Sequence, residues 1–203
     1  MTTDTERAPS SRVIYAIVGV LLAVLLLGAG GYMFLAEKPP VALAVGGPFS
    51  LVDGDGKPVT DQTWRGKYML VYFGYTYCPD VCPTTLTAVA DALDRLGPKA
   101  DKLQPLFITV DPKRDTPLVI KQYAAAFGPK MIGLTGSAAQ IAVVAKAYRV
   151  YYAEHRTGDG PDDYAMDHSS VLYLMGPDGR FVAPIRADLG GPEIAAAIAK
   201  LIS

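Results

Sequence analysis

The sequence is poor in the side chains that hold metal-rich or disulfide-rich proteins together. Its 203 residues include only two cysteines, two histidines and one tryptophan. Two cysteines exclude a disulfide-rich scaffold and any metal site built from four cysteine ligands. With two histidines as well, few combinations of side chains remain for holding a soft metal ion.

An excess of charge of either sign is also missing. Lys and Arg number 19 and Asp and Glu number 20, which gives a formal net charge of -1. A nucleic-acid-binding protein normally carries a marked basic excess, so this balance argues against that class and against a nucleic-acid partner. Half of the residues are hydrophobic and 19% are charged, a composition that indicates a folded domain rather than a disordered chain.

One long hydrophobic segment lies near the N-terminus. Residues 13–35 contain no charged side chain, and at ~1.5 Å per residue they form roughly 35 Å of helix, enough to cross a bilayer. The run is longer than the core of a signal peptide, so we predict an uncleaved transmembrane helix after a tail of residues 1–12. Arg7 and Arg12 precede the span and only Lys38 follows it closely. This bias predicts a single-pass inner (cytoplasmic) membrane protein whose soluble domain lies on the periplasmic side.

Residues 36–48 are rich in Pro and Gly and predict a linker, which is followed by a globular domain over residues 49–203. We predict hairpins at 49–60 and 170–183, strands at 68–73, 106–110 and 150–154, and helices at 84–96, 117–127, 137–148 and 192–202. This order resembles the thioredoxin-like α/β fold, a mixed sheet with flanking helices, with an extra N-terminal β-hairpin.

Both cysteines lie in one short segment between a predicted strand and a predicted helix. Pro83 is expected to keep Cys82 out of the αR region and to begin the helix, which places Cys82 at or near the N-cap. Backbone amides and the helix dipole favour an anion there, so we predict a lowered pKa for the Cys82 thiol. The four-residue separation of Cys78 from Cys82 allows either a disulfide or joint ligation of one metal ion. It is wider than the Cys-x-x-Cys spacing of common dithiol oxidoreductases.

His168 is the histidine that we expect to join the two cysteines. It lies in a predicted loop before the second hairpin, and in a thioredoxin-like arrangement that loop packs beside the first strand-to-helix turn. His155 falls in a polar stretch and is expected to be a solvated loop residue. Two thiolates and one imidazole form a soft set of three ligands, which suits copper and leaves one position open for transfer.

Three further features allow two interpretations each. The charged residues of segment 111–115 form either a capped turn before a helix, or a loop that orients the cysteine segment or meets a partner. Asp80 is either a solvated acid or a hydrogen-bond partner of the site. The aromatic residues between positions 72 and 77 favour core packing with a partly exposed rim over a recognition patch.

Three sequence motifs, in this order, resemble the SCO/SenC family of copper chaperones, over residues 45–203. They are Cys-Pro-Asp-Val-Cys-Pro at 78–83, Val-Asp-Pro-Lys-Arg-Asp-Thr-Pro at 110–117 and Asp-His-Ser at 167–169. The resemblance implies a thioredoxin-like fold and copper binding through Cys78, Cys82 and His168. It also implies delivery of copper to the binuclear copper site in subunit II of cytochrome c oxidase, with an upstream copper donor or thiol reductant as a second partner.

Two functions therefore remain open. The first is a membrane-anchored copper chaperone, not an enzyme in the usual sense, in which Cys78 and Cys82 bind copper when reduced and release it as a redox-active disulfide. The alternative is an extracytoplasmic thiol–disulfide oxidoreductase that reduces cysteines of the same or another target. His168 discriminates between them, because dithiol exchange does not need an imidazole ligand. A peroxide-reducing enzyme is disfavoured, and a redox or copper sensor is not separated from the chaperone.

Overall fold

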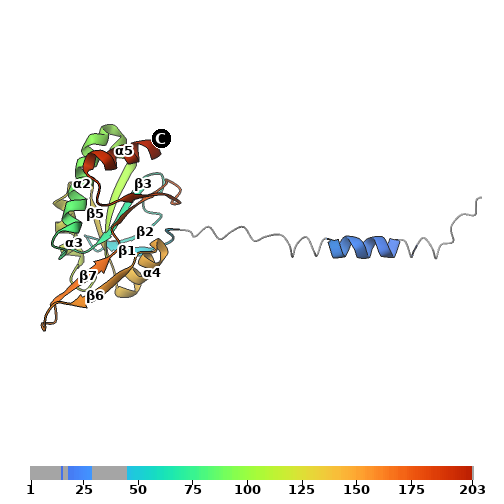
Figure 1. The fold of residues 1–203 in the computed structure, drawn as a ribbon, viewed down its shortest axis with the longest axis horizontal. Coiled ribbons are helices and arrows are strands. Elements are labelled where there is room, and N and C mark those ends of the chain that lie inside the picture. Colours follow the sequence, from blue (N-terminus) through green and yellow to red (C-terminus); the bar gives the residue numbers. More distant parts are fainter. Residues whose placement is uncertain (1–14, 16–17, 29–44, 203) are drawn as a thin grey trace, which may run out of the picture. The chain divides into compact units, whose positions relative to one another are not determined.

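The computed structural model describes residues 15, 18–28 and 45–202 of the chain (Figure 1). The chain divides into two units, with the boundary between Leu43 and Ala44. In the first unit the described residues are helical and exposed. The predicted transmembrane range 13–35 lies partly outside the described residues, and none of the helices within them is long and apolar enough to cross a membrane. The transmembrane helix, like the tail and most of the linker, therefore stays a prediction.

A mixed seven-stranded sheet forms the centre of the second unit, in the order β2-β1-β5-β4-β3-β8-β9. The three central strands β5, β4 and β3 are parallel, and the strands on either side of them pair antiparallel. The strands are β1 (Ser50–Asp53), β2 (Pro58–Thr60), β3 (Tyr68–Gly74), β4 (Leu103–Thr109), β5 (Ile132–Thr135), β8 (Val171–Met175) and β9 (Phe181–Arg186). The predicted N-terminal hairpin and the predicted second hairpin are confirmed as β1–β2 and β8–β9.

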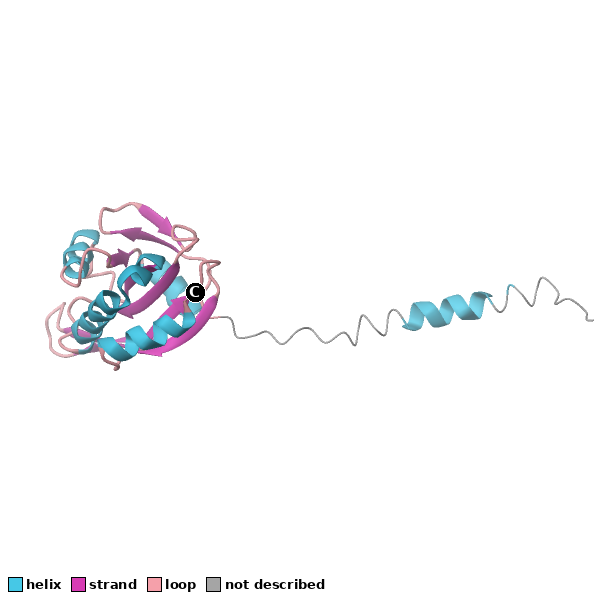
Figure 2. Ribbon diagram, turned by 90° about the horizontal axis from the view of Figure 1, so that it is seen from above, coloured by secondary structure: helices cyan, strands magenta, loops and turns pink. Residues whose placement is uncertain are grey.

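Helices cover both faces of this sheet, as Figure 2 shows. They are α2 (Val81–Leu96), α3 (Pro117–Ala125), α4 (Ala138–Tyr148) and α5 (Gly191–Leu201), with a 3-10 helix at Gly97–Lys102. The β3–α2–β4 and β4–α3–β5 connections step the same way across the sheet, so right-handed crossovers place α2 and α3 on one face. In Figure 1, α5 lies beside α2, and α4 covers the other face. This is the predicted thioredoxin-like α/β architecture.

β3 is the strand that leads to the cysteines, and it is buried along almost its whole length. Every residue of β3 after Tyr68 is buried, because β4 and β8 pair with its two edges and helices cover its two faces. A strand covered on both faces needs a continuous apolar run, and the sequence Met-Leu-Val-Tyr-Phe supplies it. The rigid end of this strand gives the following loop a fixed starting point.

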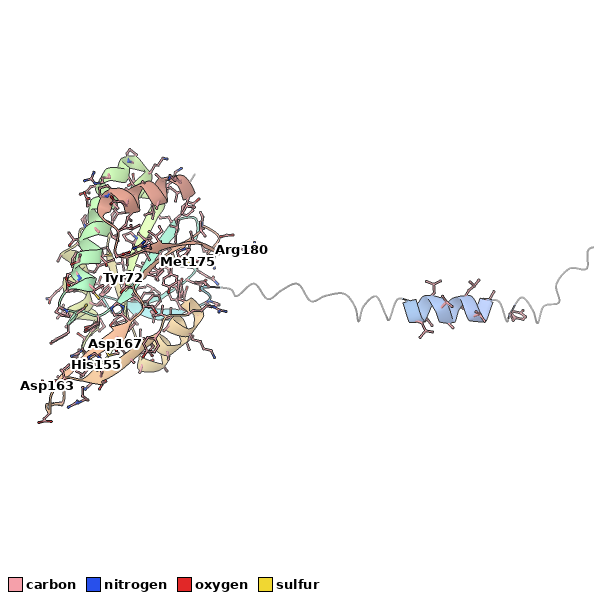
Figure 3. The ribbon with its side chains drawn as sticks, in the orientation of Figure 1. Tyr72, His155, Asp163, Asp167, Met175 and Arg180 are labelled. Carbon is pink, nitrogen blue, oxygen red and sulfur yellow. The ribbon has the colours of Figure 1, made fainter. Side chains whose placement is uncertain are left out.

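A separate two-stranded hairpin carries His168. Its strands β6 (Tyr152–Arg156) and β7 (Tyr164–His168) pair antiparallel and project away from the main sheet in Figure 1. Figure 3 shows Asp163 at the tip of this hairpin and Asp167 along it. The sequence predicts a loop up to His168, but His168 is the last residue of β7. The alternation of buried Tyr164 and Met166 with the more exposed Ala165 and Asp167 is the half-buried strand pattern that a loop assignment overlooks.

Two other element assignments also differ from the sequence prediction. β5 is not predicted, because it has four residues and includes Gly133, which lowers strand propensity. Glycine is needed there, since a Cβ would lie 2.6 Å from the backbone oxygen of Ile120. α2 begins at Val81 rather than Thr84. Pro83 fits inside its first turn, where backbone amides have no acceptor within the helix.

Candidate metal centre

Cys78, Cys82 and His168 converge on one point of the structure. Their ligand atoms all lie within 4.8 Å of one another, the one such group of three found among the described residues. Cys78 comes from the loop after β3, Cys82 from the first turn of α2 and His168 from the end of β7. Both cysteines are free thiols; Cys82 is buried and Cys78 is partly exposed.

Gly74, the last residue of β3, makes room for the buried sulfur of Cys82. A Cβ at Gly74 would lie 2.6 Å from Sγ of Cys82 and 2.8 Å from the ring of Phe107. Real Cβ atoms do not approach other atoms so closely, so a side chain here would displace the sulfur or the ring. The strand therefore ends in glycine because the site packs against it.

The two thiols have opposite electrostatic surroundings. The backbone amide of Cys82 donates a hydrogen bond to Sγ of Cys78 across 3.4 Å. The pKa of Cys78 is lowered to about 4, first by a side-chain hydrogen bond with Cys82, with help from His168 and from the amides of Cys82 and Asp80. The pKa of Cys82 is raised, because its side-chain hydrogen bond with Cys78 and its burial both favour the protonated form.

The predicted lowering of the Cys82 pKa is therefore wrong. The main reason is the side-chain hydrogen bond between the cysteines, which favours the anion on Cys78 and the proton on Cys82, and burial of Cys82 acts in the same direction on its thiol. The first-turn amide of Cys82 also points back to the sulfur four residues earlier, so the helix N-terminus stabilises charge on Cys78. The prediction also placed Cys82 outside the αR region at the N-cap. Asp80 holds the N-cap position instead, and Cys82 is the second helical residue.

Contacts on both ring nitrogens orient His168. Nε2 lies 3.3 Å from Sγ of Cys82, and Nδ1 lies 3.2 Å from the carbonyl oxygen of Ser169. A carbonyl oxygen can only accept, so we assign the proton to Nδ1 and the free lone pair to Nε2, which faces the thiols. The rings of Tyr72 and Tyr75 meet the imidazole edge-on, with centroids 6.1 and 6.0 Å away. A fixed tautomer and ring orientation are what a metal-ligating histidine needs.

Asp115 holds the cysteine loop, the segment between β3 and α2 that carries Cys78, through hydrogen bonds. Its carboxylate accepts hydrogen bonds from the backbone amide of Thr76 at 3.0 Å, the hydroxyl of Thr76 at 2.6 Å and the hydroxyl of Thr109 at 2.6 Å. Burial raises the pKa of Asp115, while the threonine donors act in the opposite direction. Both interpretations of segment 111–115 hold: it is a turn before α3, which Thr116 caps by accepting from the amide of Val119, and through Asp115 it also orients the cysteine loop.

The remaining candidate residues lie outside the ligand cluster. Asp80 is exposed and accepts a hydrogen bond from the hydroxyl of Thr84 at 3.2 Å. His155 is solvated, as predicted, although it lies on β6 rather than in a loop; its Nδ1 is 3.5 Å from a carboxylate oxygen of Asp167. Neither residue joins the convergent group of three ligand atoms.

The aromatic residues between positions 72 and 77 divide as predicted into core and rim. Tyr72, Phe73 and Tyr75 are buried, whereas the side chain of Tyr77 is largely exposed. The contacts of Tyr72 and Tyr75 with His168 were not predicted. Strand alternation indicates which aromatic side chains are buried, but it gives no sign of a partner on a distant hairpin.

The SCO1/SenC family model matches residues 37–203. The SCO2-like protein RP587 of Rickettsia prowazekii is 38% identical over 188 residues, which are 86% of this chain and 92% of that protein. The mitochondrial protein SCO2 of Saccharomyces cerevisiae is 40% identical over 176 residues, which are 79% of this chain and 58% of that protein. The chain spans about half the length of the mitochondrial relatives that it matches.

The second unit of the chain has the same fold as a solved structure. The structure of Bradyrhizobium japonicum ScoI with copper bound superposes with a TM-score of 0.72 at 48% sequence identity. The match covers 78% of this chain and 100% of that one. At this identity the likeness extends beyond the fold to the sequence.

Proposed function

The chain belongs to the SCO1/SenC family, and from that premise we propose that it is a copper chaperone whose cargo is held by Cys78, Cys82 and His168. The main support for the proposal is that two sulfur atoms and one imidazole nitrogen all lie within 4.8 Å of one another. Thiolates select soft ions such as Cu(I), and imidazole also suits copper. Copper bound to the related ScoI supports the same cargo here.

The two thiols play different parts in capturing the ion. Cys78 has a pKa of about 4 and is a thiolate at neutral pH, so it offers the first anionic ligand from a partly exposed position. Cys82 is a buried thiol with a raised pKa, and it loses its proton as it ligates the metal. Nε2 of His168 supplies the third ligand without losing a proton, since Nδ1 carries it.

Release of copper uses the coordination position that the three protein ligands leave open. A client protein with soft ligands can enter there and take the ion by ligand exchange. Thiol–disulfide exchange supplies a second control: Cys78 and Cys82 form a disulfide by passing two electrons to a disulfide in a partner, which becomes a dithiol. The disulfide form has lost both thiolate ligands and does not retain copper.

The binuclear copper site in subunit II of cytochrome c oxidase is the proposed client, with an upstream donor protein or thiol reductant preparing the chaperone. A membrane helix at 13–35 would anchor the domain at 49–203 on the periplasmic side of the inner membrane. The uncharged segment 13–35, preceded by Arg7 and Arg12, supports this anchoring.

One observation favours a second candidate function, that of an extracytoplasmic thiol–disulfide oxidoreductase. Cys78 is partly exposed and has a lowered pKa, which are the properties of an attacking thiolate. Such a reaction has no need of the imidazole held 3.3 Å from Cys82. Retention of full thiol-exchange activity without any copper affinity would favour this second function.

The test uses the full chain, reduced and purified in detergent under anaerobic conditions. Cu(I) is titrated against a chromophoric chelator, and the loaded protein is then mixed with the apo copper-binding domain of cytochrome c oxidase subunit II. We expect one equivalent of copper to bind and then to move to subunit II. Failure to bind Cu(I) would overturn the chaperone function, and binding without transfer would overturn the proposed client.

A further inference from the structure

Arg114 is a buried cation between the two chain segments that carry the candidate ligands. Its side chain is 7% exposed. The guanidinium carbon lies 3.6 Å from the ring centroid of Tyr164 and 4.6 Å from that of Tyr77. Tyr77 directly precedes Cys78, and Tyr164 begins β7, the strand that ends at His168. One side chain therefore contacts both ligand-bearing segments.

Hydrogen bonds hold Arg114 to the β6–β7 hairpin. Its Nη1 donates to the carbonyl oxygens of Asp162 at 3.2 Å and Tyr164 at 3.0 Å, and its Nε donates to the carboxylate of Asp111. The same carboxylate accepts from the hydroxyl of Tyr164 at 2.9 Å. Nη2 has no hydrogen-bond partner among the described residues. Stacking on the tyrosine rings is the interaction left for that side of the guanidinium group.

A third tyrosine links this cluster to the metal ligand itself. The ring centroid of Tyr75 is 5.8 Å from the guanidinium carbon of Arg114 and 6.0 Å from the ring of His168. The hairpin has only two strands, and a two-stranded hairpin is marginally stable by itself. Removing one partner of a buried ion pair leaves the other charge buried and unpaired, so loss of Arg114 should be felt where its partners lie, at Asp111 and in the hairpin.

We propose that Arg114 is a positioning residue for the metal centre, which sets the distance between Nε2 of His168 and the sulfurs of Cys78 and Cys82. Asp115, in the same segment, holds the cysteine loop through Thr76, while Arg114 and Asp111 hold the hairpin. Segment 111–115 thus ties one side of the site to the other. The inference rests on the proposed function for its ligand set and adds the element that assembles it.

The test compares Arg114→Met with a matched control, Arg180→Met, in the full chain. The side chain of Arg180 is 89% exposed, and Figure 3 shows it well away from the hairpin. In the copper-free protein we expect Arg114→Met to lose the NMR cross-peaks between the rings of His168 and Tyr75. We also expect amide exchange in β6 and β7 to speed up by about tenfold or more, and by more than in the rest of the domain.

Copper provides a second readout. Changing a residue that orients a metal ligand typically weakens metal binding by about 10–100-fold, and we expect this range for Arg114→Met. Electron paramagnetic resonance of the Cu(II) form should show a weakened nitrogen coupling. Arg180→Met should match the wild type in every measurement.

A folded Arg114→Met protein with wild-type cross-peaks, exchange and copper affinity would overturn the inference and leave the proposed function standing. If the wild type itself binds no copper, the proposed function fails, while the copper-free readouts still decide the role of Arg114. If Arg114→Met does not fold, Tyr164→Phe decides, since it removes only the hydroxyl that bonds to Asp111. Faster exchange in β6 and β7 of that variant supports the inference, and unchanged exchange overturns it.

Discussion

The backbone amide of Cys82 donates a hydrogen bond to Sγ of Cys78 across 3.4 Å, and it adds to the side-chain hydrogen bond between the two cysteines that makes their thiols unequal. The donor belongs to the first turn of α2, where amides have no partner within the helix. The helix N-terminus thus stabilises negative charge on the loop cysteine, not on the helical one. The partly exposed sulfur is an anion and the buried sulfur keeps its proton.

The first prediction concerns the pH dependence of alkylation. Because the pKa of Cys78 is lowered to about 4 from 9.0, its thiolate persists as the pH falls through neutrality. The rate of iodoacetamide labelling of Cys78 should therefore level off well below pH 7. In Cys82→Ala the principal stabilising hydrogen bond is gone, and the midpoint should move to higher pH. A wild-type midpoint close to that of a free cysteine would contradict the asymmetry.

The second prediction separates the two histidines. His168→Ala removes the nitrogen that faces the thiols, and copper affinity should fall by more than the roughly 10–100-fold typical of losing an outer partner of a ligand. The dithiol should still oxidise to a disulfide. His155→Ala is the control, because this exposed side chain lies 3.5 Å from Asp167 and outside the group of convergent ligand atoms. Equal affinities of the two variants in a chelator competition would contradict the assignment.

The third prediction concerns the space beside Cys82. Gly74→Ala places a methyl group 2.6 Å from Sγ of Cys82, so the domain should lose about 1–3 kcal/mol of stability and bind copper more weakly. Gly47→Ala is the control, since its Cβ would lie at an ordinary 3.5 Å from Ala147. Chemical denaturation and copper titration measure both effects. Wild-type behaviour of Gly74→Ala would show that the end of β3 does not constrain the sulfur.

The fourth prediction concerns the buried carboxylate of Asp115. Asp115→Ala leaves the donors of Thr76 and Thr109 without their acceptor, which should lower the free energy of unfolding by at least about 2 kcal/mol. Asp101→Ala, which removes an exposed ion pair with Lys130, is the control and should change it by about 0–1 kcal/mol. Similar denaturation midpoints for the two variants would contradict the role given to Asp115.

The sequence predicts the approach of His168 to the cysteines because it predicts the order of the elements. Once β3, α2 and the second hairpin are placed in a thioredoxin-like order, the segment before β8 must pass the strand-to-helix turn. The identity of that segment as a strand is harder to predict. Its polar residues, such as Asp167, are those of a hairpin that leaves the main sheet.

The supporting contacts could not be predicted from the sequence, because they join residues far apart in it. Thr76 and Asp115 are 39 positions apart, and Tyr164 and Asp111 are 53 positions apart. No local pattern marks such pairs. The direction of the Cys82 amide is likewise a property of the helix start, which Pro83 led the prediction to place three residues too late.

X-ray absorption at the copper edge of the Cu(I)-loaded, reduced chain tests the three-ligand site most directly. We predict a first shell of two sulfur atoms and one nitrogen atom, and the loss of the nitrogen contribution in His168→Ala with both sulfurs retained. A wild-type shell made of sulfur alone, or a nitrogen contribution that survives in His168→Ala, would contradict the assignment of Cys78, Cys82 and His168 as the site.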